Sequence, residues 1–105
     1  MADRGSYVGL DVDLATGEGV TPIAKIVLDA QLFSLIAEGE TCMGWPGGKI
    51  QNLYDDVMKA WDPYGSLPSL LPADLREKHE KLYGSAIKQA KKNGWDPDQD
   101  LENDR

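Results

Sequence analysis

The strictest hydrophobic pattern in this chain is an alternation over residues 7 to 14. Apolar side chains stand at every second position from Val8 to Leu14, and tyrosine, glycine or aspartate stands at the positions between them. A period of two places successive side chains on opposite faces of an extended chain, so the pattern predicts a half-buried β-strand. Such a strand needs a partner, because a lone strand leaves its backbone hydrogen-bonding groups unsatisfied.

Residues 20 to 28 are the nearest candidate partner strand. They follow a glycine-rich turn and are rich in β-branched side chains, which favours a β-hairpin. Thr21 and Pro22 permit another interpretation, since a threonine N-cap with proline at the first helical position begins a helix, here over residues 22 to 38. We favour the hairpin, because the first strand is otherwise left alone unless it pairs across a homodimer. Residues 30 to 38 then form a short buried helix.

Two longer helices are expected in the second half of the chain. Apolar residues from Ile50 to Trp61 recur at spacings of three, four and seven, which predicts an amphipathic helix that ends before Pro63. The next helix is expected to begin after Pro72 and to end at Gly94, a residue suited to the left-handed conformation that follows many helices. These elements predict an α+β fold, in which one short and two longer amphipathic helices follow an N-terminal β-hairpin.

A length of 105 residues suits one domain with one hydrophobic core, which we expect over residues 1–97. The acidic segment 98–105 has no apolar periodicity and is expected to be disordered. One cysteine cannot form an internal disulfide, and the chain has neither a signal-like start nor an apolar run of bilayer length. A cytoplasmic protein that does not contact membranes is therefore expected.

The charge distribution bears most directly on function. Eighteen acidic side chains against eleven lysines and arginines give a net charge of −7, divided as −6 over residues 1–72, +3 over residues 73–94 and −4 over residues 95–105. An acidic surface repels nucleic-acid phosphates and attracts basic proteins. The leading hypothesis is therefore a small, non-catalytic protein-interaction module that binds a basic protein partner and regulates or inhibits it. No nucleic acid is expected as a partner.

The expected partner-binding residues are exposed carboxylates and one loop tryptophan. Two of these carboxylates share the outward face of the predicted strand, and the others lie in the following turn and on the first of the two longer helices. The expected contact residues are Asp11, Asp13, Glu18, Trp45, Asp55 and Asp56. Carboxylates on a strand also prevent its edge from pairing with other chains, which is their purely structural explanation.

A small enzyme or a ligand-binding subunit is the alternative hypothesis. Asp11 and Asp13 would supply paired carboxylates for acid–base chemistry if they lay in a partly buried site. The loop from Gly44 to Lys49 precedes a helix, where backbone amides can bind an anion through Gly47, Gly48 and Lys49. This loop lacks the first glycine and the Ser or Thr of a phosphate-binding P-loop, which favours a plain connecting loop.

Cys42 and His79 are the only thiol and the only imidazole in the chain. A Cys–His nucleophile needs both side chains within hydrogen-bond reach, and a zinc site needs more of these ligands than the chain contains. His79 lies in a charged run typical of a helix surface, and Cys42 lies beside apolar residues typical of a buried thiol. No catalytic residue, metal or cofactor is therefore expected.

Overall fold

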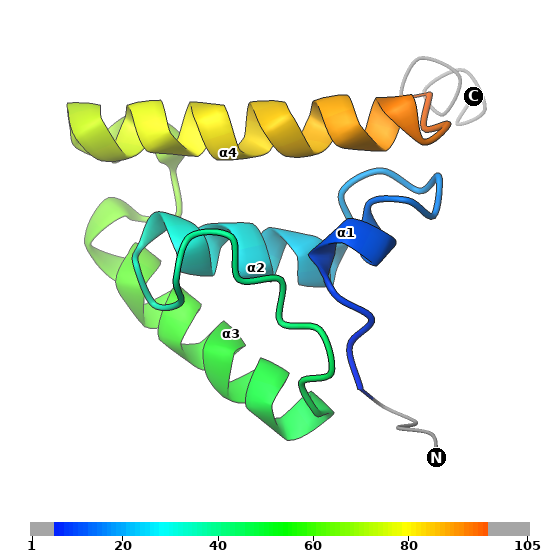
Figure 1. The fold of residues 1–105 in the computed structure, drawn as a ribbon. Helices are drawn as coiled ribbons and strands as arrows, with labels where there is room; N and C mark the ends of the chain where they lie inside the picture. The colour runs from blue at the N-terminus through cyan, green and yellow to red at the C-terminus, as the bar shows by residue number, and fades with distance from the viewer. Residues whose placement is uncertain (1–5, 97–105) are drawn as a thin grey trace, which may run out of the picture.

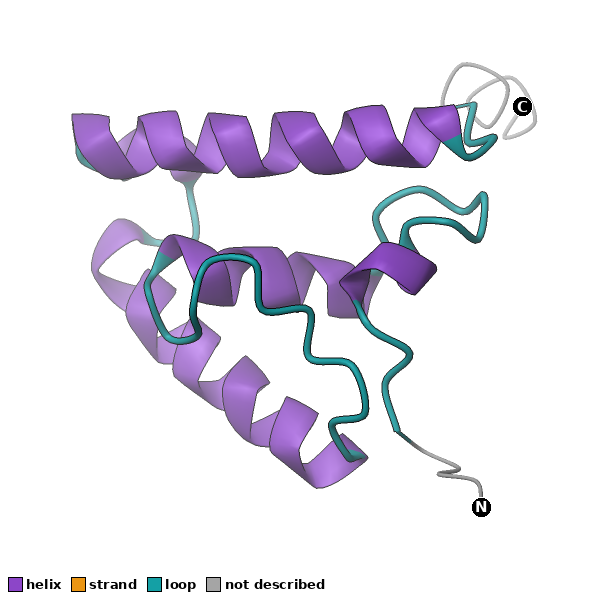
Figure 2. Ribbon diagram, viewed as in Figure 1, coloured by secondary structure: helices purple, strands orange, loops and turns teal. Residues whose placement is uncertain are grey.

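The computed structural model describes residues 6–96, and within this range the chain is helical and has no β-strand (Figures 1 and 2). Its α-helices in that range are α1 (Leu10–Asp13), α2 (Pro22–Leu32), α3 (Gly47–Trp61) and α4 (Ala73–Lys92). The 3-10 turns η1 (Asp62–Tyr64) and η2 (Pro68–Leu70) connect α3 to α4. The central helix is α2, since it contacts α1, α3 and α4. The acidic segment 98–105, for which we expect disorder, lies outside the described residues.

The expected α+β class and its N-terminal β-hairpin are wrong, because residues 7–14 do not continue as an extended strand. Gly9 interrupts the extended chain with a φ of 99°, in the left-handed region that favours glycine. A Cβ atom at this position would lie 2.9 Å from the Cβ atom of Met43, so the close approach also requires glycine. The chain turns here into the single helical turn of α1.

Burial in this segment follows helical spacing. Leu10, Asp13 and Leu14 share one buried face, as residues three and four apart do on a helix. Val8 and Val12 are 51% and 53% exposed, although an alternating strand would have buried them with the two leucines. The alternative in which an N-terminal strand pairs across a homodimer accordingly has no strand edge in this part of the described chain.

The second candidate strand is also helical. Thr21 is the N-cap of α2, where its Oγ1 accepts a hydrogen bond from the backbone N–H of Ala24 at 3.2 Å, and a proline occupies the first helical position. This start is the one that the helical interpretation predicts. The helix ends at Leu32 and residues 33–46 contain no helix, so the expected short helix over residues 30–38 is wrong.

The two longer helices are confirmed. As predicted, α3 ends at Trp61, two residues before Pro63, and it buries Leu53, Val57 and Trp61. As predicted, α4 begins directly after Pro72, and the following Gly94 has a φ of 107°. Along α4, Ala86 and Ala90 are buried, and Leu75, Leu82, Tyr83 and Ile87 are half-buried.

The carboxylate of Asp29 connects three helices. It lies half-buried on α2, and its two oxygens accept hydrogen bonds from α3 and α4. Trp61 donates from Nε1 to Oδ2 at 3.0 Å, and the hydroxyl of Tyr83 donates to Oδ1 at 2.7 Å. Burial and the hydrogen bond to this carboxylate raise the pKa of Tyr83 well above its ordinary value, so the phenol remains a donor into the alkaline range.

Aromatic rings pack around this junction. Trp61 contacts Phe33 edge to face at a centroid distance of 5.2 Å, and Phe33 stacks on Tyr64 at 6.3 Å. On α4, His79 stacks on Tyr83 at 4.4 Å and meets Trp61 nearly at right angles at 6.3 Å. Aromatic pairs of this kind contribute roughly 0.5–1.5 kcal/mol each beyond their burial. The C-terminal ends of α2 and α3 are thereby held together against α4.

Replacing Asp29 by alanine tests this junction. We expect Asp29→Ala to lower the free energy of unfolding by about 2–4 kcal/mol, because two donors lose their acceptor. The matched control is Asp55→Ala on the exposed face of α3, which should change the free energy by no more than about 0.5 kcal/mol. Urea titrations followed by tryptophan fluorescence measure both changes. Equal effects of the two substitutions would contradict the role given to Asp29.

Candidate functional site

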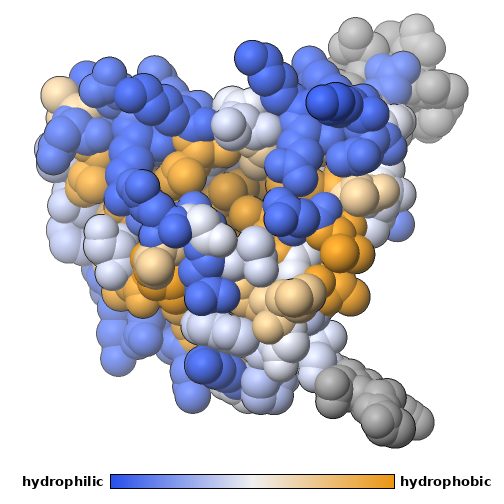
Figure 3. All heavy atoms as spheres, viewed as in Figure 1, coloured by the Kyte–Doolittle hydropathy of each residue, from blue (hydrophilic) through white to orange (hydrophobic). Residues whose placement is uncertain are grey.

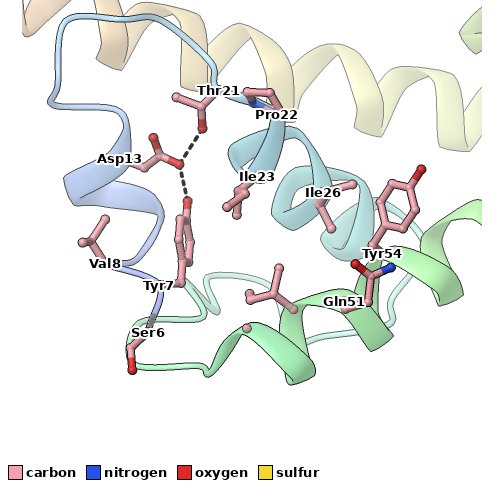
Figure 4. A pocket seen from close by; sticks show the side chains of 12 residues that line it. Ser6, Tyr7, Val8, Asp13, Thr21, Pro22, Ile23, Ile26, Gln51 and Tyr54 are labelled. Carbon is pink, nitrogen blue, oxygen red and sulfur yellow. Dashed lines mark hydrogen bonds between the residues drawn. The ribbon is translucent and has the colours of Figure 1, made fainter. Parts of the chain in front are cut away.

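A groove with a volume of about 790 Å³ opens between the N-terminal segment, α2 and α3. Its lining comes from residues 6–8, from Ile23 and Ile26 in the first turns of α2, and from the first two turns of α3. Figure 4 shows Tyr7 at one end of the groove and Tyr54 at the other, with the two isoleucines of α2 between them. No residue of α4 lines the groove, and α4 packs along a different side of α2 (Figure 1).

The lining is mainly apolar and open to solvent. Val8, Ile23 and Tyr54 are 51%, 41% and 42% exposed. Figure 3 shows apolar side chains gathered beside α1 and the N-terminal segment on the face in view. Apolar side chains gathered in one exposed groove, on a chain of net charge −7, are typical of a binding surface.

Asp13 forms the polar end of the groove. Its Oδ2 accepts a hydrogen bond of 2.6 Å from the hydroxyl of Tyr7 and another of 2.6 Å from the hydroxyl of Thr21 (Figure 4). Burial, and then the hydrogen bond to Asp13, raises the pKa of Tyr7 far above its ordinary value. Because Thr21 also caps α2, the carboxylate fixes the N-terminal segment to the start of that helix.

The N-terminal segment is held on its other side by the loop before α3. The backbone N–H of Tyr7 donates to the carbonyl of Trp45 at 2.9 Å, and Gly44 donates to the carbonyl of Tyr7 at 2.8 Å. The backbone N–H of Leu10 donates to the carbonyl of Thr41 at 3.0 Å. The wall of the groove formed by residues 6–8 is therefore attached both to α2 and to this loop.

The structure separates the two aspartates that we expected on one face. Asp13 is 6% exposed and lines the groove, whereas Asp11 is exposed and accepts a hydrogen bond of 3.3 Å from Nε2 of Gln89 on α4. The expectation of a shared outward face is wrong, because these residues lie on a helical turn rather than on a strand.

The other expected carboxylates are exposed and lie outside the lining. Glu18 lies in the loop between α1 and α2, and its backbone N–H donates to Oγ1 of Thr16 at 3.3 Å. Asp55 and Asp56 lie on the exposed side of α3. Asp55 accepts a hydrogen bond of 3.2 Å from Gln51, which does line the groove, so Asp55 borders the groove.

The loop considered as an anion site leads directly into α3. The ammonium group of Lys49 lies 4.0 Å from the ring centroid of the half-buried Trp45, in a cation–π contact. Gly47 and Gly48 form the first turn of α3, and Gly47 is also part of the groove lining. Of the expected residues in this loop, the structure thus brings Trp45 and Lys49 together and places Gly47 at the groove.

Cys42 and His79 lie in different surroundings. Cys42 is fully buried in the loop before α3, and its backbone N–H donates to Oε2 of Glu40 at 2.9 Å. His79 lies on α4 against Tyr83. In the described part of the chain, no group of three or more His, Cys, Asp or Glu side chains is arranged to hold a metal ion. Across the same residues, no helix combines the length and the apolar character needed to cross a bilayer.

Sequence reasoning did not identify the apolar lining of the groove. One signal does point to it, because α3 carries two parallel apolar rows rather than one. The inner row is buried and consists of Leu53, Val57 and Trp61. The outer row, at the same spacing of four, is half-buried or exposed and consists of Ile50, Tyr54 and Met58. An apolar stripe wider than one core face indicates a second contact surface.

Comparison with protein-family models, curated proteins and solved structures gives no match to this chain. Its function is therefore inferred from the geometry and the charge of the groove. The relevant observations are the exposed apolar side chains of Val8, Ile23 and Tyr54 and the net negative charge of residues 6–72, the segment that contains the whole lining.

The buried thiol of Cys42 makes stability depend on alkaline pH. Burial, and then the carboxylate of Glu40, raises the pKa of this thiol from its ordinary 9.0 to about 11. A raised pKa in the folded chain stabilises it fully below the unfolded value, and this stabilisation is lost as pH rises from about 9 through about 11. We therefore expect the free energy of unfolding of Cys42→Ala to fall less than that of the unmodified chain across this window.

Urea titrations from about pH 8 to about pH 11 measure the difference. Tyr7 and Tyr83, whose pKa values are also raised, add a loss above about pH 10 that both proteins share. Identical pH profiles for the two proteins would contradict a buried, neutral thiol.

Proposed function

We propose that this chain is a small acidic protein-interaction module whose groove binds an apolar segment of a basic protein partner. The observation that most supports this proposal is that Val8, Ile23 and Tyr54 remain exposed within one concave surface. Burying apolar surface stabilises a complex by roughly 25 cal/mol per Å² before the entropic cost of association. A partner that covers this lining would therefore gain affinity from side chains that the fold leaves in water.

The polar groups of the groove support binding rather than catalysis. The hydroxyl hydrogens of Tyr7 and Thr21 are both directed at the carboxylate of Asp13. A general base must lie within hydrogen-bond reach of a substrate proton, and this carboxylate already accepts two protein donors on one oxygen. The groove thus offers apolar contact surface together with polar groups that bind one another.

Charge supports a basic partner. The part of the chain that contains the whole lining, residues 6–72, has nine acidic side chains and three lysines, a net charge of −6. The helix α4 has a net charge of +3 and packs on a different side of α2 (Figure 1). Attraction between opposite charges raises the rate of association and orients the partner toward the acidic side of the molecule.

The proposed consequence of binding is regulation or inhibition of the partner. A module that covers an apolar segment of another protein prevents that segment from making other contacts. The effect on the partner then follows from competition for one surface and requires no chemical step. The cytoplasm is the proposed place of this interaction.

Two substitutions in the groove test the proposal against one outside it. We expect Ile23→Ser and Tyr54→Ser each to weaken binding by about tenfold or more, as loss of a central apolar contact does. Leu67→Ser is the matched control, because Leu67 is 52% exposed and does not line the groove. The partner is captured from the native cell on the unmodified chain, identified by mass spectrometry, and its Kd is measured for each variant.

Thermal midpoints accompany these measurements, because exposed substitutions should leave folding nearly unchanged. The association rate should also fall steeply between about 50 mM and about 500 mM salt, since the Debye length shortens severalfold. Equal Kd values for Ile23→Ser, Tyr54→Ser and Leu67→Ser would exclude the groove as the binding site. A rate that is independent of salt would exclude attraction to a basic partner.

A further inference from the structure

We infer, on the basis of the proposed function, that the partner segment in the groove is an amphipathic α-helix of about two to three turns. One face of this helix would carry apolar residues that enter the groove, and the remaining positions would carry lysine or arginine. Backbone hydrogen bonding, the spacing of the lining residues and the charge of the molecule each point to this occupant.

A segment that buries its backbone in the groove must satisfy its own N–H and C=O groups. Residues 6–96 contain no β-strand, so they offer no sheet edge to which an extended peptide could add. Tyr7 and Thr21 both donate to Asp13, and the backbone of Tyr7 is paired with Gly44 and Trp45. An α-helix needs none of these groups, because it forms its backbone hydrogen bonds internally.

The apolar lining has the spacing of helical ridges. Ile23 and Ile26 on α2 are three residues apart, and Ile50 and Tyr54 on α3 are four residues apart. Side-chain rows at these spacings pack into the matching grooves of another helix. The lined part of α3, residues 47–54, rises roughly 10 Å, which corresponds to about two turns of an occupant helix.

The negative charge of this part of the molecule favours a cationic helix as the occupant. Residues 6–72 have a net charge of −6, and Asp55 accepts a hydrogen bond from Gln51, which lines the groove. Lysine and arginine on the flanks of an apolar stripe have the length to reach such carboxylates. In a second copy of this chain, the cationic α4 already packs its buried alanines against the core. That helix would have to leave its own domain to fill the groove.

Peptide display tests this inference while the partner is still unidentified. Random 14-residue peptides on phage are selected on the unmodified chain and counter-selected on Ile23→Ser, with Tyr54→Ser as a second groove variant and thermal midpoints as the folding control. We expect enriched peptides to be cationic, with apolar residues at i, i+3 or i+4, and i+7. As synthetic peptides they should gain helical circular dichroism on binding, bind Ile23→Ser at least tenfold more weakly, and bind Leu67→Ser like the unmodified chain.

The possible outcomes separate this inference from the proposed function. Peptides whose binding depends on Ile23 could bind without gaining helix, or could be enriched in proline or acidic residues. Either result would overturn the cationic helix and would leave protein binding in the groove intact. Failure to enrich any peptide that distinguishes the unmodified chain from both groove variants would overturn the inference and the proposed function together. Self-association that Ile23→Ser abolishes, measured by sedimentation, would make a second copy of this acidic chain the occupant. That result would overturn both the cationic helix and the basic partner.

Discussion

The carboxylate of Asp29 is the interaction on which the arrangement of the helices depends. It is a half-buried acceptor on the central helix, and its donors, Trp61 and Tyr83, come from the two helices that pack against α2. Removing a partly buried acceptor leaves two donors without a partner, which costs more than a typical hydrogen bond contributes. At the other end of α2, Asp13 holds the N-cap residue Thr21 in the same way. The carboxylate of Asp13 thus holds the start of α2, and the carboxylate of Asp29 holds the part near its end.

This arrangement explains why a groove exists. Where Trp61 contacts Asp29, α2 and α3 lie close together, and they diverge toward their N-terminal ends (Figure 1). The groove lies at that open end, between Ile23 and Tyr54, and the N-terminal segment forms its remaining wall. The helical ridges of α2 and α3 remain uncovered there because no described helix packs into the space between them. A helix supplied by a partner would fill that space with the same packing that stabilises the interior of the protein.

The sequence predicted the elements that are determined locally. The ends of α3 and α4 follow from Pro63, Pro72 and Gly94, each of which acts on its immediate neighbours. The strand prediction failed because an alternating pattern that contains Leu10 and Leu14 also satisfies the i, i+4 spacing of a helix, and Gly9 decides between the two. The groove was beyond prediction, since the arrangement of α2, α3 and α4 depends on contacts 32 and 54 residues apart in the chain. Only the second apolar row of α3 is visible in the sequence.

The central claim is that a protein partner covers the groove, and site-specific photo-crosslinking in the native cell tests it most directly. A benzoylphenylalanine residue replaces Ile23 in one variant and Leu67, which is similarly exposed but lies outside the groove, in another. The account predicts a crosslinked protein partner from position 23 and none from position 67. Crosslinking from position 67 alone, or to the same extent from both positions, would contradict the groove as the binding surface.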